Sequence, residues 1–253
     1  MKKAVFITVF TLLLLILLGQ KKNKTTSIME DSADPTQAQN SAKAASMWCK
    51  SLSISIKQAI PVRLSGSVQF DGAKFRLRAG SLFGPEIDVG MNERYLWYWS
   101  KRLKPRALYY CPIKEVGRSG LKSALNPSWV MASLCMDASK PAGAERISVG
   151  KGEMYICKHE NHAESGMSIG KLFDRSNLIG IYLFAGSGKM VASSEVSSRQ
   201  MVNGTSMPRS LHVIWYDEGI VMDWTLGSVY LGREVPHEAW VMPPMRPLVD
   251  ISK

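Results

Sequence analysis

Alternation of apolar and polar residues is the sequence feature that most constrains the fold of this chain. Residues 52–57 read Leu-Ser-Ile-Ser-Ile-Lys, and residues 62–70 and 75–79 continue the same two-residue period. Residues two apart in an extended strand share one face, so this period predicts strands with one apolar and one polar face. Asp71-Gly72 separates the last two segments, and both residues tolerate the positive φ of a tight hairpin turn.

The same pattern extends over most of the chain. We expect further strands at 86–89, 95–99, 153–158, 167–175, 178–185, 189–196, 211–216 and 220–225. Short turns join most neighbours, which predicts a mainly β (α+β) domain built on an antiparallel meander. Such a sheet must curl over its apolar face or use helices as a lid, and short helices are predicted at 118–125 and 128–135. Thr36 is a candidate cap for another helix that runs to about Trp48.

The N-terminal segment predicts the compartment. An uncharged apolar run at 4–18 follows a positive start, which is typical of a signal-peptide core or a membrane helix. Gln20 stands where a lipoprotein signal carries its lipidated cysteine, which excludes that lipidation. We expect 1–22 to be an uncleaved membrane anchor, 23–39 a polar linker and 40–253 one β domain. This places the domain in the cell envelope outside the cytoplasm; secretion after cleavage is the alternative.

The chain is basic, with a formal net charge of +11 and a pI near 9.5. A basic surface suits anionic lipid headgroups or nucleic acid, and export removes nucleic acid from reach. One local cluster of cations follows two outward-facing tryptophans. We expect these side chains to contact a membrane or a protein partner, with core packing and a solvated loop as the alternatives: Trp97, Trp99, Lys101, Arg102, Lys104 and Arg106.

None of the candidate motifs for catalysis, metal binding or cofactor binding has the residues and spacing that its chemistry requires. The four cysteines lack CxxC pairs and zinc-finger spacing to histidine, which leaves two disulfides or free thiols open. His159 and His162 are three residues apart, whereas a zinc protease helix needs four. Residues 186–189 fit a hairpin rather than a phosphate loop, and His212 has no assignable nucleophile or carboxylate partner. We therefore expect a protein that is not an enzyme and has no metal or cofactor.

The order of these features resembles the LolA/LolB superfamily of bacterial lipoprotein-localisation factors. The resemblance covers most of residues 40–253. It rests on segments 64–68 (Leu-Ser-Gly-Ser-Val), 75–77 (Phe-Arg-Leu), 88–92 (Asp-Val-Gly-Met-Asn), 96–99 (Leu-Trp-Tyr-Trp), 126–130 (Asn-Pro-Ser-Trp-Val) and 240–244 (Trp-Val-Met-Pro-Pro).

The resemblance implies an incomplete β-barrel covered by helices, with an apolar cavity that holds lipid or lipoprotein acyl chains. Burial of hydrocarbon there stabilises a complex by about 0.8 kcal/mol per methylene. Asp71-Gly72 replaces a basic residue of the soluble carrier, and an anchored chain cannot shuttle, so a tethered acceptor or lipid-binding relative is expected. A structural envelope protein with a filled core is the alternative. The inward set expected to line the cavity is Val68, Phe70, Phe75, Leu77, Ile87, Val89, Leu96 and Tyr98.

Overall fold

A single 15-stranded sheet dominates the computed structural model, which describes residues 46–57, 61–116, 127–150, 152–158 and 166–252. The first six strands are β1 (Ser46–Lys57), β2 (Val62–Asp71), β3 (Lys74–Ser81), β4 (Gly84–Met91), β5 (Tyr95–Ser100) and β6 (Leu108–Pro112). The next seven are β7 (Glu145–Val149), β8 (Gly152–Lys158), β9 (Ser168–Asp174), β10 (Asn177–Phe184), β11 (Met190–Val202), β12 (Thr205–Trp215) and β13 (Ile220–Leu226). The remaining elements are β14 (Val229–Leu231), β15 (Leu248–Asp250), the helix α2 (Pro127–Ser133) and the 3-10 turns η2 (Ile113–Glu115) and η5 (His237–Trp240).

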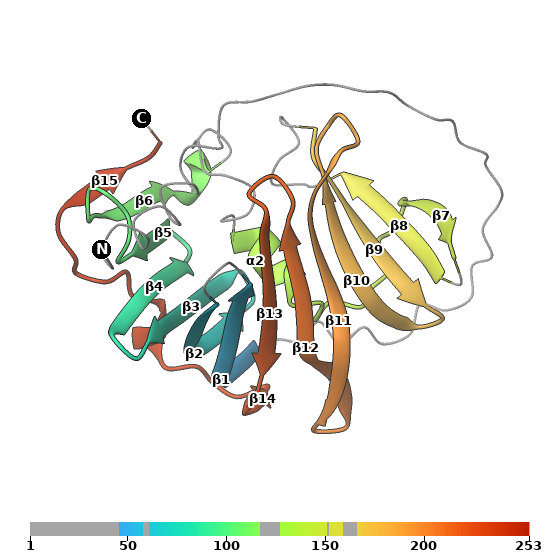
Figure 1. Cartoon of the computed structure of the whole chain (residues 1–253), viewed down its shortest axis with the longest axis horizontal. Helices are drawn as coiled ribbons and strands as arrows, with labels where there is room; N and C mark the ends of the chain where they lie inside the picture. The colour runs from blue at the N-terminus through green and yellow to red at the C-terminus, as the bar shows by residue number, and fades with distance from the viewer. Residues whose placement is uncertain (1–45, 58–60, 117–126, 151, 159–165, 253) are drawn as a thin grey trace.

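Two antiparallel meanders form this sheet. Strands β1 to β6 pair with their sequence neighbours, and β7 to β13 do the same. The two meanders join where β1 pairs antiparallel with β13. Figure 1 shows them as the two halves of a curled open sheet, blue to green on one side and yellow to orange on the other. This confirms the predicted mainly β class and curled antiparallel sheet.

The predicted hairpins follow from local sequence. Asp71 pairs with Lys74 across a two-residue turn in which Gly72 has a φ of 57°. A side chain is strained at that φ, which glycine adopts freely. The 186–189 segment joins β10 to β11 as the predicted hairpin.

The apolar faces of both meanders pack around one core on the concave side of the sheet. The short helix α2 contributes Trp129 and Val130 to it, and Leu134 follows directly after the helix; each is no more than 7% exposed. α2 contacts β4 and β10, which belong to opposite meanders. It therefore lies across the concave face and is a described part of the predicted helical lid (Figure 1).

The chain end covers part of the opposite, outer face. Residues 232–250, here called the C-terminal strap, run from the end of β14 through η5 to β15. β15 pairs in parallel with β6 at the sheet edge, as expected for the proline-rich end of the chain. Val235, Ala239 and Trp240 of the strap pack against Trp48 in a second, smaller apolar cluster.

One sequence prediction needs correction, and three others lie outside the described residues. The helix predicted to reach Trp48 is wrong at residues 46–48, which belong to β1, because long-range pairing with β2 and β14 outweighs local helix preference. The anchor at 1–22, the linker at 23–39 and the helix at 118–125 lie outside the described residues. Among the helices that are described, none has the length and apolar character needed to span a bilayer.

Candidate functional site

The eight residues predicted to line a cavity do share the inner face of β2 to β5. Cross-strand register places Val68 opposite Leu77, Leu77 opposite Val89, and Val89 opposite Tyr98. A parallel row places Phe70 opposite Phe75, and the same alternation puts Ile87 and Leu96 on this face. The sequence period therefore identified the inner face correctly.

Protein atoms fill the space against five of these side chains. Val68, Phe75, Leu77, Val89 and Leu96 are between 0% and 7% exposed. A side chain that borders an empty cavity keeps accessible surface toward that cavity, so these five do not border one. The inner face is therefore packed at these five positions, and a ligand cavity there stays a prediction. The other three predicted residues, Phe70, Ile87 and Tyr98, are half-buried.

The helix α2 is held on the inner face by packing and a small set of hydrogen bonds. The Ser194 hydroxyl of β11 donates to the Ser133 carbonyl at 2.6 Å, and the Cys135 thiol donates to the Ser194 carbonyl at 3.7 Å. Burial raises the pKa of the Cys135 thiol to about 12, so that thiol stays protonated. The lid is thus attached mainly by apolar burial, which a bound hydrocarbon chain could replace.

Trp97 does not lie where the contact prediction placed it. Its side chain is fully buried, and its Nε1 donates to Asp88 Oδ1 at 3.3 Å. The ring covers Gly90, where a Cβ would lie only 2.2 Å from Trp97 Cζ2. Trp97 therefore cannot contact a membrane or a partner in this structure, because its ring is enclosed beside Gly90 and Asp88 of β4 and Arg76 of β3.

The turn between β3 and β4 carries the most exposed apolar side chains near the predicted contact cluster, and the sequence analysis did not predict it as a contact site. Leu82 is fully exposed and Phe83 is 85% exposed in the turn between β3 and β4. Two consecutive large apolar residues between Ser81 and Gly84 were the available signal, because hairpin turns usually carry polar residues. We call Leu82 and Phe83 the hairpin tip.

The predicted basic cluster lies partly at the base of this tip. Lys101 donates through Nζ to the Phe83 carbonyl at 3.0 Å and pairs with Glu86 Oε1 at 3.6 Å. Arg102 Nε donates to Glu86 Oε2 at 3.2 Å. Lys104 and Arg106 are exposed in the following loop. One carboxylate thus faces two cations at the tip, which leaves a local excess of positive charge.

Comparison with solved structures settles the architecture. A domain of a proposed outer membrane lipoprotein-sorting protein from Vibrio parahaemolyticus superposes with a TM-score of 0.53 at 7% identity, covering 79% of this chain and 90% of that one. A LolA superfamily protein from Nitrosomonas europaea gives 0.52 at 11% identity, covering 79% and 91%. A DUF1329 family protein from Desulfovibrio piger gives 0.53 at 9% identity, covering 79% and 93%.

The chain has a LolA-like fold. At these identities the likeness concerns the fold alone. No protein-family model matches the sequence, and no curated protein matches it either. The LolA-like sheet here consists of the two joined meanders, with α2 on the concave side.

A row of polar side chains crosses the outer face of the LolA-like sheet on β12, β13 and β1. His212 Nδ1 lies 2.8 Å from Asp223 Oδ1, and Lys57 Nζ lies 2.9 Å from Asp223 Oδ2. The hydrogen bond from His212, together with Lys57, lowers the pKa of Asp223. This corrects the view that His212 lacks a carboxylate partner, since Asp223 reaches it across the β12–β13 hairpin. Among the described residues, Asp223 is the only hydrogen-bond partner of His212, and no nucleophile joins the pair.

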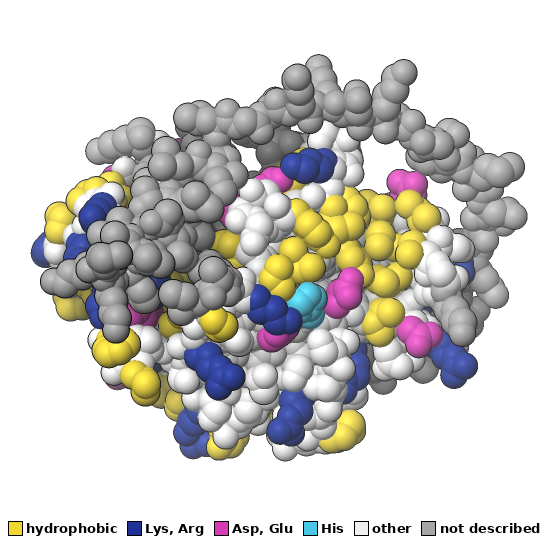
Figure 2. Space-filling model, in the orientation of Figure 1, with side chains coloured by type: hydrophobic (Ala, Val, Ile, Leu, Met, Phe, Trp, Pro, Cys, Tyr) yellow, Lys and Arg dark blue, Asp and Glu magenta, His cyan; other side chains and the backbone are white. Residues whose placement is uncertain are grey.

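Two further predictions concern the cysteines and the pair of histidines at 159 and 162. Cys49 and Cys135 are buried free thiols, so the two-disulfide alternative is wrong. His159 and His162 lie outside the described residues. Beyond the polar row, hydrophobic side chains gather over the outer face of β9 to β12 in Figure 2.

Proposed function

We propose that this LolA-like chain is a non-enzymatic cell-envelope protein that binds lipid or lipoprotein acyl chains between its inner sheet face and α2. The observation that carries the proposal is the apolar inner face covered by a single described helix of seven residues. Reversible burial of hydrocarbon requires such a face and no catalytic group. A role in sorting lipoproteins toward the outer membrane is consistent with this arrangement.

Binding exchanges protein contacts for ligand contacts. The core at Val68, Phe75, Leu77 and Val89 is filled, so an acyl chain enters only as α2 withdraws Trp129 and its neighbours. Each methylene then regains about 0.8 kcal/mol on burial. A chain of ordinary acyl length therefore offsets the exposure of a few core side chains.

Two indole groups on the inner face of β12 and β13 offer hydrogen bonds to an acyl ligand. The Nε1 atoms of Trp215 and Trp224 are buried and have no hydrogen-bond partner within the described structure. A buried N–H without an acceptor costs about 1–3 kcal/mol. The ester or amide carbonyl of an acylated ligand supplies such an acceptor, so these groups favour acyl esters or amides over plain hydrocarbon.

Trp129 provides the test of lid opening. Acrylamide quenching of tryptophan fluorescence is compared for the wild-type chain and Trp129→Phe, with and without a synthetic diacylated lipopeptide. The lipopeptide should raise quenching in the wild type and leave the Trp129→Phe signal unchanged, because α2 moves away from the sheet. Equal quenching with and without lipopeptide in the wild type would contradict the proposal.

The hairpin tip and its cations contact an anionic membrane in this proposal. Insertion of the fully exposed Leu82 and Phe83 removes apolar surface from water at about 25 cal/mol per Å², and each nearby Lys or Arg adds about 1 kcal/mol at an anionic surface. Lys101 lies directly against the Phe83 carbonyl. Trp99, half-buried beside this region, faces the same side of the sheet as Arg78 and Asp88.

Sedimentation with vesicles tests this contact. The double variant Leu82→Ser/Phe83→Ser should lose most binding to vesicles that contain phosphatidylglycerol. Met201→Ser is the matched control, because Met201 is 68% exposed near a different hairpin end. If both variants sediment with the vesicles as the wild type does, the tip does not contact the membrane.

The second candidate function is a structural envelope protein that binds another protein. The filled core at the five buried inner-face positions favours it. It predicts that no acyl ligand enters and that α2 stays closed in the quenching experiment above.

A further inference from the structure

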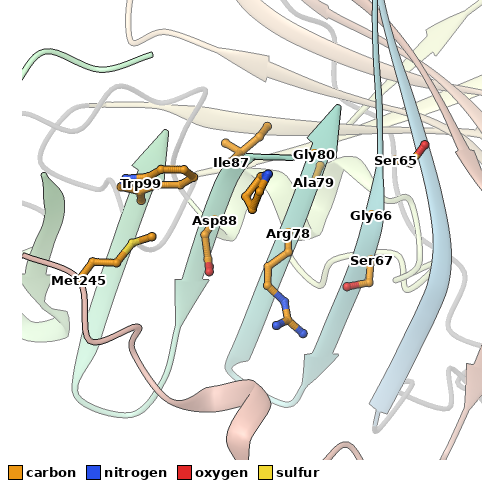
Figure 3. A pocket seen from close by; sticks show the side chains of 11 residues that line it. Ser65, Gly66, Ser67, Arg78, Ala79, Gly80, Ile87, Asp88, Trp99 and Met245 are labelled. Atoms are coloured by element: carbon orange, nitrogen blue, oxygen red, sulfur yellow. The ribbon is translucent and has the colours of Figure 1, made fainter. Parts of the chain in front are cut away.

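A groove on the outer face of the sheet lies close to the hairpin tip. It has a volume of about 360 Å³ and extends over β2, β3, β4 and β5, with the strap on one side. Figure 3 shows Ser67, Arg78, Asp88 and Trp99 along neighbouring strands, with Met245 of the strap near Trp99. The strand register confirms this row, because each of the four residues is paired with the next.

The cation in this groove is not neutralised by the carboxylate beside it. Asp88 stands directly opposite Arg78, but its oxygens accept from Arg76 at 3.1 and 2.8 Å and from Trp97. Arg76 is 7% exposed and binds strap carbonyls with its other nitrogen, so it holds Asp88 permanently. Arg78 is exposed, and within the described structure no side chain or carbonyl accepts from it.

Hydroxyl groups and bare backbone complete the polar side of the groove. Ser65 and Ser67 line it on β2, with Ser67 directly opposite Arg78 and Ser65 two residues farther along the strand, opposite Gly80. Among the described residues, no side-chain hydrogen bond engages either hydroxyl. The floor includes Gly66, where a Cβ would lie 1.8 Å from the Arg78 carbonyl oxygen, so no side chain can obstruct it. A guanidinium with two hydroxyls is a suitable donor set for a phosphate group.

The apolar side of the groove limits the rest of the ligand. Trp99 and Met245 form the opposite wall, and Pro85 adds apolar surface toward the tip. A free phosphate ion leaves these side chains uncovered. A phosphate diester with an attached glycerol and short hydrocarbon portion covers both sides.

The position of the groove relative to the hairpin tip indicates that the phosphate belongs to a membrane lipid. Gly80 and Pro85, which line the groove, pair at the base of the hairpin that carries Leu82 and Phe83. A strand rises about 3.3 Å per residue, so Arg78 lies roughly 13 Å from Leu82 along β3. A tip inserted about 5–10 Å below the headgroup boundary therefore places Arg78 at the level of the lipid phosphates.

We propose that this outer-face groove binds the phosphate of an anionic phospholipid headgroup, with Arg78, Ser65 and Ser67 as donors and Trp99 and Met245 against the glycerol and first methylenes. The proposal rests on the membrane contact of the tip and gives that contact its lipid preference. It is separate from the acyl-binding inner face, because the sheet lies between the two.

The test uses the full chain and dihexanoylphosphatidylglycerol, a soluble short-chain lipid, kept below its micelle concentration. Tryptophan fluorescence reports binding, and Trp99→Phe identifies the responding ring. Arg78→Gln should weaken binding at least tenfold. Arg209→Gln is the matched control, because Arg209 is exposed on β12 and lies outside the groove, and it should change affinity less than twofold.

Two further experiments distinguish a lipid phosphate from free phosphate, and the groove proposal from the membrane contact of the tip. Inorganic phosphate should compete only at concentrations at least a hundredfold higher than the lipid; equal competition would overturn the headgroup assignment. Leu82→Ser/Phe83→Ser should abolish vesicle binding and leave the short-chain lipid affinity unchanged. If Arg78→Gln binds the short-chain lipid as tightly as the wild type does, the proposal for the groove is overturned, and the tip contact stands. If the tip variant binds vesicles as the wild type does, while Arg78→Gln still weakens binding of the short-chain lipid, only the tip contact is overturned.

Discussion

At the scale of single residues, Gly90 and Trp97 show how the outer face accommodates a buried ring. Gly90 of β4 is directly opposite Trp97 of β5, and the ring lies flat over the position where a side chain would begin. Arg76 stacks above the same ring, with its guanidinium carbon 5.7 Å from the ring centroid. The ring is therefore enclosed on both sides and has no room to move.

Gly90→Ala should lower the free energy of unfolding by about 1–3 kcal/mol, because the new Cβ overlaps a ring that cannot shift. Urea unfolding followed by circular dichroism measures this change. Trp97→Phe in the same background should recover part of the loss by removing the overlapping ring atoms. If the losses in unfolding free energy simply add in the double variant, the new Cβ at position 90 and the Trp97 ring do not clash.

Glu86 links stability to pH. Burial would raise the pKa of this carboxyl, but hydrogen bonds from Ser81 and Arg102 and the charges of Arg102 and Lys101 lower it below the ordinary value of 4.5. A lowered folded-state pKa stabilises the fold above the unfolded pKa and loses that contribution as the pH falls through the folded value. The contribution is therefore complete at pH 7 and declines below about pH 4.5.

Glu86→Gln should be less stable than the wild type at pH 7 by about 1 kcal/mol, and the difference should shrink as the pH falls from 4.5 to 3. Urea midpoints measured at several pH values between 3 and 7 check this trend. A difference that is constant over the whole range would mean that the Glu86 charge does not stabilise the fold.

Residue roles were predictable from sequence only where one face was plainly apolar. Val68 and Leu77 alternate with polar neighbours, so their inward direction was evident. Residues 95–99 read Tyr-Leu-Trp-Tyr-Trp, which is apolar or aromatic on both faces, so the period could not tell that Trp97 is fully buried. Its ring lies against Gly90 and near Arg76, and these contacts depend on strand register, which local sequence does not specify.

At the scale of elements, the strap depends on one buried arginine. Arg76 Nη1 donates to the Ala239 and Val241 carbonyls at 3.0 and 3.1 Å, while its other nitrogens donate to Asp88. Asn92 Nδ2 adds a bond to the Trp240 carbonyl at 3.0 Å. The η5 turn is thus attached through hydrogen bonds from Arg76 of β3 and from Asn92 after β4, in addition to its apolar packing against Trp48.

Arg76→Met should destabilise the protein by about 3–5 kcal/mol, because it leaves the Asp88 charge buried without its partner. It should also make the strap more sensitive to limited proteolysis. Lys189→Met is the matched control, since Lys189 pairs with Asp217 at 2.6 Å in an exposed pair expected to contribute less than about 1 kcal/mol. Equal losses in the two variants would show that burial of the Arg76 pair is unimportant.

Hairpins and the strands beside them were predictable because their signals are local. Asp71-Gly72 and the 186–189 turn carry the residues that tight turns need. The start of β1 was not predictable, because an alanine-rich sequence before Trp48 favours a helix and only pairing with β2 and β14 makes it a strand. The pairing of β15 with β6 is equally remote in sequence.

At the scale of the whole molecule, one long-range pair turns two meanders into a single curled sheet. Leu52 to Lys57 of β1 pair with Val221 to Leu226 of β13, which is the step that makes the inner faces of the two halves continuous. Local periods predict each meander but not their junction. The LolA-like fold follows from this junction together with α2, which spans β4 and β10.

The packed inner face was the part of the site that sequence could not predict. An apolar strand face has the same alternation whether it lines a cavity or a filled core. The volume of Trp129 and Leu134 decides between the two, and α2 brings these side chains from the middle of the chain to the inner face. The function then depends on whether α2 can leave the sheet.

Native mass spectrometry of the full chain with a diacylated lipopeptide is the most direct test of acyl binding between α2 and the sheet. We expect a complex of one lipopeptide per chain that survives transfer to the gas phase and releases intact lipopeptide on denaturing extraction. A spectrum that shows only the apo mass at lipopeptide concentrations well above micromolar would contradict acyl binding and favour the structural role.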